Sequence, residues 1–354
     1  MRATPFESTE GSALPPFPEG WYFVASREDL RRKKIIHKTW LGEEIVLWCD
    51  DEGQICMAEA FCPHMGAFLA PEAGARVCNG RLVCPFHGFE FVADGQCVAT
   101  PYAPPPASAR LKVYETRELE GMVFGWWGTR GRPAQWQLPE KRQDEDGWSD
   151  IRLRTIRIPG HPQETTENSV DLAHLRYVHG YENVQRTGKL LIDGAYLKSC
   201  FDFNARIRIA GPLNTVFDVT TVTHVHGLGY SQVDFEERSI GYRARLWVLS
   251  TPVDGTSIDL TLASRVGDMR RPKRAVFGFR FLPLRARVDV MNRLVLAKEA
   301  GYVSEDVLIW RRKRYLPHPR LNRADGEILA YRRYCDQFYG NERVNTPRLI
   351  VGRA

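Results

Sequence analysis

The sequence predicts an α+β protein, in which a β-rich first third precedes an antiparallel sheet that is closed by C-terminal helices. In residues 21–127, short apolar runs alternate with turn residues, which is the pattern of an all-β domain. Between residues 196 and 266, apolar and polar residues alternate over long runs, which predicts strands with one buried face. Residues 286–340 have a helical pattern, so helices are expected to follow these strands.

The predicted strands of the first third are short and apolar. They are WYFVA (21–25), EIVLWC (44–49), QICMAEAF (54–61), RLVC (81–84), LKVYE (111–115) and GMVFGWW (121–127). Turn residues such as Asp51-Glu52-Gly53 separate them. Prolines at 101 and 104–106 predict an ordered, extended loop, because proline has no N–H to donate to a sheet.

The rest of the chain starts with a helical segment at 163–180. The alternating runs that follow it predict long strands at 196–209, 216–226, 241–250 and 256–266. Gly301 and Pro317 are expected to interrupt the C-terminal helices, since both residue types weaken a helix interior.

Length and composition predict two domains. A chain of 354 residues exceeds one typical domain, and its polar, turn-rich stretch GTRGRPAQWQLPEKRQDEDGWSD lies near the middle. The expected organisation is therefore a domain at 1–128, a linker at 129–150 and a second domain at 151–354.

The composition is that of a water-soluble globular protein, with 43% apolar and 26% charged residues. A net charge of +6 is too mild to indicate a nucleic-acid ligand. The sequence contains no run of about 20 apolar residues, which a membrane-spanning helix would need. Its first residues lack the apolar segment of a secretion signal. The eight cysteines are accordingly expected to be reduced thiols in a cytoplasmic protein.

Two near-duplicate loops carry the strongest motif. Cys62-x-His64 lies in FCPHMGA, and Cys84-x-x-His87 lies in CPFHGF. In a Rieske [2Fe–2S] centre two thiolates hold one iron and two imidazoles hold the other, so each loop has to supply one ligand of each kind. These loops do so, and they predict such a cluster. The proline loop at 101–106 is expected to cover it.

A structural zinc site is the main alternative, because it uses the same ligand types. Structural zinc usually takes a pair of cysteines from one segment and a pair of histidines from another, whereas these loops each mix the two. The zinc alternative is therefore disfavoured. The cysteines in or beside predicted strands, at 49, 56, 97 and 200, are expected to be small buried hydrophobic residues.

A second metal site is predicted in NSVDLAHLRYVHG (168–180). His174 and His179 are one and a half helical turns apart, so they converge only if the helix is locally distorted. Two histidines and one carboxylate, with open coordination positions, form the ferrous site that activates O₂. Two histidines on an apolar helix are otherwise commonly packing residues, and the upstream cluster favours the metal interpretation.

The carboxylate has to come from another segment. SEDVLIW (304–310) offers Glu305 and Asp306, at the start of a predicted helix. Either residue also suits a helix N-terminus as a favourable negative charge. Spacing alone does not choose between them.

These residues resemble the α-subunits of Rieske non-heme iron oxygenases over essentially the whole chain. Within that group the chain is most similar to ketosteroid hydroxylase oxygenases and cholesterol desaturases, and also to aminopyrrolnitrin oxygenase. The resemblance depends on CPHMGA (62–67), CPFHGF (84–89), NSVDLAHLRYVHG (168–180), DVLIW (306–310) and YRRYCDQFYG (331–340).

The resemblance implies a role for each motif residue. The implied cluster ligands are Cys62, His64, Cys84 and His87. The implied ligands of the mononuclear Fe(II) are His174, His179 and Asp306, which takes the carboxylate's place before V-x-I-W. Asp171 resembles the carboxylate that bridges one subunit's cluster and the next subunit's iron, and the family is usually trimeric for that reason.

The resemblance also implies an activity. The expected fold of the second domain is helix-grip (START-like), and the expected reaction uses O₂ with electrons from NAD(P)H through a separate reductase, sometimes with a ferredoxin. The chain has no credible dinucleotide motif of its own. The expected enzyme is a monooxygenase that hydroxylates a bulky hydrophobic molecule, oxidises one of its methyl groups or desaturates it, and the favoured substrate is a steroid or sterol. The alternatives are an aromatic or amine natural-product oxygenase and a non-catalytic Rieske electron carrier.

Two further features remain open in the sequence. His224 and His226 alternate on one strand face, where they either line a pocket or form ordinary hydrogen bonds, the second being favoured. The segment 270–287 is basic and holds no acidic residue. It is expected to be a solvated loop, and the sharper hypothesis is peripheral contact with anionic lipid or with an acidic electron donor.

Overall fold

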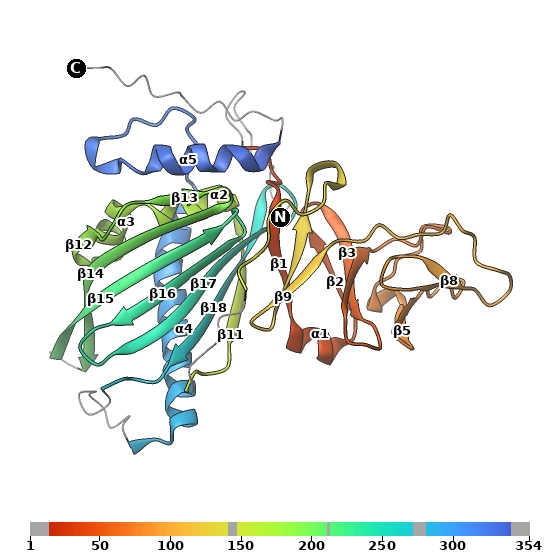
Figure 1. Cartoon of the computed structure of the whole chain (residues 1–354), viewed down its shortest axis with the longest axis horizontal. Helices are drawn as coiled ribbons and strands as arrows, with labels where there is room; N and C mark the ends of the chain where they lie inside the picture. Colours follow the sequence, from red (N-terminus) through yellow and green to blue (C-terminus); the bar gives the residue numbers. More distant parts are fainter. Residues whose placement is uncertain (1–13, 141–146, 211–212, 272–280, 341–354) are drawn as a thin grey trace, which may run out of the picture. The chain divides into compact units, whose positions relative to one another are not determined.

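The computed structural model describes residues 14–140, 147–210, 213–271 and 281–340 (Figure 1). These residues form two compact units. One unit comprises Gly20–Lys141 and Thr251–Gly255, and the other comprises the described residues of 1–19, 142–250 and 256–354. The predicted domain bounds 1–128 and 151–354 stay a prediction.

The unit that begins at Gly20 is built from three small antiparallel sheets. The first contains β1 (Gly20–Ser26), β10 (Met122–Trp127) and β9 (Thr116–Leu119). The second contains β2 (Ile36–Trp40), β3 (Glu43–Cys49) and β4 (Ile55–Glu59). The third contains β5 (Arg76–Cys78), β6 (Arg81–Val83), β7 (Glu90–Phe91) and β8 (Cys97–Ala99). The short helix α1 (Arg27–Lys33) follows β1.

One hydrophobic core joins the last two of these sheets. Val46 and Trp48 on β3 pack in it with Leu82 and Phe91 from the four-stranded sheet. The thiols of both predicted cluster loops belong to the same core. The loops are therefore anchored by their cysteines to the best-packed part of the unit.

The other unit is dominated by an eight-stranded antiparallel sheet. Its order is β11 (Arg152–Pro159), β18 (Ser257–Gly267), β17 (Tyr242–Pro252), β16 (Tyr230–Glu237), β15 (Leu213–His226), β14 (Tyr196–Ala210) and β12 (Glu182–Arg186), with β13 (Leu191–Asp193) paired to β14. The long hairpin β14–β15 is in register from Tyr196 opposite His226 onward. Alternate residues of β14 and β15 are buried, as their period of two predicts, whereas nearly every residue of β18 is buried.

Helices of this unit cover the sheet and its end. The long helix α4 (Leu284–Trp310) lies along one face of the sheet in Figure 1 and packs on β18 and β11. The helix α2 (Pro162–Thr166), the 3₁₀ turn η3 (Glu167–Ser169) and the helix α3 (Leu172–Tyr177) follow β11. The helix α5 (Ile328–Asp336) is tied to η3, because buried Arg332 donates to the Glu167 carboxylate at 2.8 Å.

This architecture confirms the predicted α+β class, with mostly antiparallel sheets and a few C-terminal helices. Three details differ from the expectation. The predicted helix at 163–180 is divided, Gly301 does not interrupt α4, and residues 111–115 precede strand β9 without forming one. Gly301 is tolerated because α4 packs along the sheet on both sides of it, which offsets the weak helix propensity of a single glycine.

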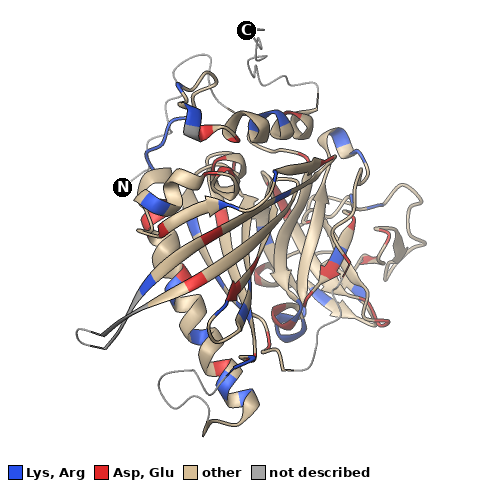
Figure 2. Cartoon of the chain, turned by 60° about the vertical axis from the view of Figure 1, so that its left-hand side comes forward, with Lys and Arg blue, Asp and Glu red and all other residues tan. Residues whose placement is uncertain are grey.

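Charged residues are interspersed over the strands and helices, and both signs occur along α4 (Figure 2). No helix in the described ranges is long and apolar enough to cross a membrane. Half of the basic segment 270–287, residues 272–280, lies outside the described residues, and its last residues begin α4, so its proposed lipid contact stays a prediction.

Candidate metal centres

The two predicted cluster loops have the same backbone design. In the first, Cys62 N–H donates to Ala67 O at 2.8 Å, and Gly66 N–H donates to Cys62 O at 2.8 Å. In the second, Cys84 N–H donates to Phe89 O at 2.8 Å, and Gly88 N–H donates to Cys84 O at 3.1 Å. Each loop closes through a glycine with positive φ, so the sequence duplication is also a structural one.

The four side chains of these loops are arranged as a Rieske centre requires. Cys62 and Cys84 are 2% exposed, whereas His64 is exposed and His87 is half-buried. The two imidazole rings lie 4.9 Å apart between centroids. Burial, together with the neighbouring Cys84 thiol, raises the pKa of Cys62 to about 12, although a backbone hydrogen bond opposes the shift. Two thiols therefore lie inward and two imidazoles outward.

His87 gives the most direct indication that this site binds a metal. Its Nδ1 is buried and has no hydrogen-bond partner within the described part of the chain. A buried ring nitrogen without a partner is costly unless it serves as a metal ligand. The residues present thus fit a [2Fe–2S] cluster held through Cys62, Cys84, His64 and His87.

Aromatic side chains and the proline loop surround these imidazoles. Phe89 stacks on His64 at 4.3 Å, and Phe86 lies 3.8 Å from the His87 ring. Tyr102, in the predicted proline loop, lies 6.5 Å from His87 and is largely exposed. Phe89 thus covers one face of the His64 imidazole, and Tyr102 brings the proline loop near His87, while the covering role of that loop stays a prediction.

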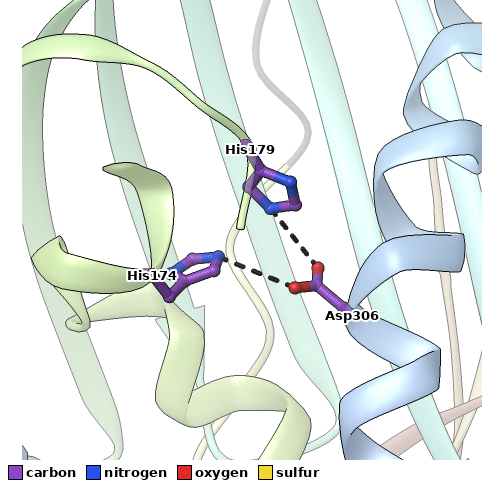
Figure 3. A group of neighbouring side chains, drawn as sticks. All are labelled: His174, His179 and Asp306. Atoms are coloured by element: carbon purple, nitrogen blue, oxygen red, sulfur yellow. Dashed lines mark ion pairs between the residues drawn. The ribbon is translucent and has the colours of Figure 1, made fainter. Parts of the chain in front are cut away.

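The second candidate centre joins three side chains from two elements (Figure 3). His174 lies on α3, His179 follows the end of that helix, and Asp306 lies on α4. Their ligand atoms all lie within 4.8 Å of one another. The Asp306 carboxylate lies 3.9 Å from His174 Nε2 and 3.5 Å from His179 Nε2. Two imidazoles and one carboxylate form the donor set typical of non-heme Fe(II).

The outer nitrogen of each imidazole is held by a separate acceptor. His174 Nδ1 lies 2.9 Å from the backbone oxygen of Asp171, and His179 Nδ1 lies 3.2 Å from the Glu305 carboxylate. Such contacts orient a ring and select the tautomer whose Nε2 is free to bind a metal. The residues present therefore fit a mononuclear iron held through His174, His179 and Asp306.

Asp171 also begins the helix that carries His174. It is the N-cap of α3, and its Oδ1 accepts hydrogen bonds from the backbone N–H groups of Ala173 and His174. An N-cap carboxylate stabilises a short helix whose first N–H groups would otherwise be unpaired. Asp171 thus positions His174 both through its side chain and through its carbonyl. Its predicted role as a bridge between subunits stays a prediction.

The two histidines differ in their electrostatic surroundings. Burial lowers the pKa of His174, against the opposing effects of Asp171 and Asp306. Burial alone would also lower the pKa of His179, but Asp306 and Glu305 together raise it above its ordinary value. Both carboxylates thus favour positive charge at His179, as they would favour a cation bound beside it.

Two sequence expectations about this centre need correction. Glu305 and Asp306 were expected at the start of a helix, but they lie near the end of α4, so a favourable N-terminal charge does not explain them. His179 was expected on the same helix as His174, but α3 ends at Tyr177. The chain leaves the helix at that point, which brings the two imidazoles to 5.0 Å between centroids without a distorted helix.

An apolar cavity of about 230 Å³ lies beside this centre, between the sheet and α4. Tyr181 and Tyr302 line it, and their rings lie 5.8 and 5.3 Å from that of His179. The other cavity walls are mainly Phe, Val, Leu and Met side chains of β14–β17 and α4. These residues were missed in the sequence, where they are indistinguishable from ordinary core positions of amphipathic strands.

His224 and His226 do not belong to this cavity. Val219 and Val225 on β15 are buried, and Val219 lines the cavity. Successive side chains of a strand point to opposite faces, so His224 and His226 lie on the face away from the cavity. His224 Nδ1 lies 2.8 Å from Tyr196 Oη, and its Nε2 lies 3.5 Å from Asp234. The favoured expectation of an ordinary hydrogen-bonded strand histidine agrees with these contacts for His224, and for His226 it stays a prediction.

Comparison with known proteins gives matches in both parts of the chain. Residues 20–115 match the Rieske [2Fe-2S] domain, and residues 125–339 match the 3-ketosteroid 9alpha-hydroxylase C-terminal domain. The cholesterol 7-desaturase nvd 1 of Ciona intestinalis is 29% identical over 96% of this chain and 72% of its own length. The oxygenase component of 3-ketosteroid-9-alpha-monooxygenase from Rhodococcus rhodochrous is 28% identical over 94% of this chain and 86% of its own.

Solved structures show the same fold at lower identity. Dicamba monooxygenase bound to dicamba is 18% identical, with a TM-score of 0.61 over 90% of this chain and 96% of its own. NdmA of Pseudomonas putida CBB5 with caffeine is 16% identical, with a TM-score of 0.68 over 88% of each chain. The matched domains and the two sets of donor residues together lead to one conclusion. The chain belongs to the Rieske oxygenases, with a Rieske [2Fe–2S] domain followed by a C-terminal domain of the 3-ketosteroid 9α-hydroxylase family.

Proposed function

We propose that this chain is the terminal oxygenase component of a multi-protein enzyme that oxidises a steroid or sterol. The observation that carries the proposal is the convergence of His174, His179 and Asp306 beside an apolar cavity. The curated relatives are oxygenases or desaturases named for ketosteroids and cholesterol, which are large and mostly apolar molecules. A cavity lined by aromatic and aliphatic side chains suits such a substrate.

Ferrous iron at this centre would supply the chemistry that activates O₂ for insertion or desaturation. The protein's own residues prepare that site. Asp171 and Glu305 hold the outer nitrogens of His174 and His179, so that both Nε2 atoms converge on the Asp306 carboxylate. The rings of Tyr181 and Tyr302 lie beside His179 and line the cavity, so the metal ligands border an apolar space.

Electrons are proposed to come from NAD(P)H through a separate reductase, with or without a ferredoxin, and to enter at the cluster of Cys62, His64, Cys84 and His87. The chain is proposed to work as a homotrimer, in which Asp171 links one subunit's cluster to the next subunit's iron. The position of Asp171 supports this proposed link. One of its carboxylate oxygens caps α3 beside His174, which leaves the second oxygen for a partner in another subunit.

Turnover with a surrogate electron chain tests this function. The purified protein would receive NADH, a ferredoxin and its reductase, and ¹⁸O₂, together with a panel of steroids, sterols and aromatic amines. We expect mass spectrometry to find a steroid product that is either labelled with ¹⁸O or two hydrogens poorer. Conversion of the aromatic amines alone would overturn the substrate class, and unchanged turnover by His179→Ala would overturn the assigned iron site.

A further inference from the structure

The cavity beside the iron ligands is apolar with few exceptions. Its titratable lining residues are Tyr181, Glu237, Tyr242, Lys298, Glu299 and Tyr302. Lys298 holds its ammonium 5.2 Å above the Tyr302 ring. The Glu237 carboxylate accepts hydrogen bonds from the backbone N–H groups of Ser239 and Ile240, at 3.0 and 2.9 Å. Glu237 is thus used by the turn that follows β16, and its oxygens are already bonded.

Glu299 is different from Glu237. No described residue donates a hydrogen bond to its carboxyl group, and the half-buried side chain lines the cavity. Burial raises its pKa to about 7, while Lys298 and His179 oppose the shift. Burial raises the pKa of the hydroxyls of Tyr181, Tyr242 and Tyr302, and the charge of Glu299 adds to each shift.

A polar group in such a place is costly unless a ligand satisfies it, because a buried donor or acceptor without a partner loses its interactions with water. A carboxyl group accepts a hydrogen bond from a hydroxyl in either protonation state. A ketone has no hydrogen to donate, so it pairs only with the protonated acid. The unbonded carboxyl of Glu299 therefore suits a hydroxylated substrate better than its hydrocarbon. The Tyr242 hydroxyl also lines this cavity and has no partner among the described residues, but it can donate to an alcohol and to a ketone alike, so it does not distinguish the two.

We propose that Glu299 is a specificity residue that binds the hydroxyl group of an otherwise apolar, steroid-like substrate. The proposal rests on the proposed function, because it names the substrate class of the same cavity. Glu299 and Asp306 lie on one face of α4, two turns apart, which separates them by about 10 Å along the helix axis. The oxidised carbon is accordingly one that lies far from the hydroxyl, and the hydroxyl itself is retained in the product.

Equilibrium dialysis of the iron-loaded protein, without reductase or O₂, tests the proposal separately from turnover. The probes are 5α-androstan-3β-ol, 5α-androstan-3-one and 5α-androstane, which carry a hydroxyl, a ketone and no oxygen on the same skeleton. We expect the wild-type protein to bind the alcohol about tenfold more tightly than the hydrocarbon, the size of one net hydrogen bond. The affinity for the ketone should lie between those for the alcohol and the hydrocarbon.

Three variants assign that preference to one side chain. Glu299→Leu should lose the tenfold preference, and Glu299→Gln, which keeps an acceptor, should retain most of it. Glu237→Gln makes the same chemical change at a carboxyl that is already bonded, and it should leave the ratio of the two affinities unchanged. Melting temperatures check folding, and Glu299→Leu should be at least as stable as the wild type, because it removes an unbonded carboxyl from an apolar site.

The outcomes separate this inference from the proposed function. Equal binding of alcohol and hydrocarbon by the wild type would overturn the role of Glu299 and leave the steroid assignment standing. A preference that survives in Glu299→Leu would overturn it as well. If none of the three probes binds, the steroid substrate class and the inference built on it both fail.

Discussion

At the scale of single residues, Glu305 contacts the metal site without belonging to the three predicted ligands. Its carboxylate lies 3.2 Å from His179 Nδ1 and orients the ring whose Nε2 faces Asp306. We expect Glu305→Gln to weaken iron binding by about 10- to 100-fold, the usual cost of losing such a partner. Competition with an iron chelator would measure the change.

A matched control lies on the same helix. Asp289 is partly exposed, pairs with Arg152 at 2.5 Å and with Arg293 at 3.1 Å, and makes no hydrogen bond or ion pair with the metal ligands within the described part of the chain. Asp289→Asn should leave the iron affinity at the wild-type value. Equal effects of the two substitutions would show that Glu305 acts through the charge or stability of α4 and not through His179.

Gly66 and Gly88 allow a second comparison at this scale. Both have positive φ, +74° and +69°, so alanine at either position costs about 1–2 kcal/mol of backbone strain. A Cβ at Gly66 meets nothing within 4 Å, whereas a Cβ at Gly88 would lie 2.8 Å from Pro101. We expect heat to bleach the cluster's visible absorption at a lower temperature in Gly88→Ala than in Gly66→Ala. The reverse order would argue against close packing of the proline loop on the second cluster loop.

At the scale of elements, α2 carries a buried titratable cap. His161 is its N-cap, where Nδ1 accepts from Gln163 N–H at 3.1 Å and Nε2 lies 3.0 Å from Pro15 O. Burial lowers the pKa of His161 from 6.5 to about 4, so the unfolded chain binds more protons between these values. Stability should therefore fall as the pH drops from about 6.5 to 4, by up to about 3 kcal/mol.

His161→Asn tests that pH dependence, because asparagine retains a capping side chain but does not titrate. Urea unfolding at several pH values should show a flatter profile for the variant. His226, whose pKa burial also lowers to about 4, contributes equally to both proteins, so the difference isolates His161. Parallel profiles would contradict the prediction.

The elements also show where sequence reasoning succeeds. Period-two patterns predicted the long strands β14, β15, β17 and β18, although only β14 and β15 have one clearly buried face and β18 is buried on both. The same approach treated 163–180 as one helix and expected a break at Gly301. Both errors have one cause: packing against the sheet decides where these helices end, and local propensity has little weight there.

At the scale of the whole molecule, the two centres differ in how readily they can be predicted. The cluster motif is local, because each loop supplies one cysteine and one histidine within a few residues. In contrast, Asp306 reaches His174 across more than a hundred residues, and only the resemblance to a family distinguished it from Glu305. The cavity, and Glu299 within it, depends on which strand faces meet α4, and that information is not present in any local pattern.

The proposed trimer makes a prediction about mixed assemblies. Cys84→Ser should remove the cluster and His179→Ala the mononuclear iron, so each variant alone should be inactive. If electrons cross between subunits through Asp171, trimers of the two variants mixed at random should recover about a quarter of wild-type turnover. Mixtures that stay inactive, although mass measurement shows mixed trimers, would indicate transfer within one subunit.

The central claim is that one chain holds two separate iron centres and that the one at His174, His179 and Asp306 performs the oxidation. Iron and acid-labile sulfide analysis of the wild type and of His179→Ala, with visible spectra and steroid turnover, tests it most directly. The variant should lose about one iron per chain, keep its sulfide and cluster spectrum, and lose turnover. Unchanged iron content, or steroid oxidation at the wild-type rate, would contradict the claim.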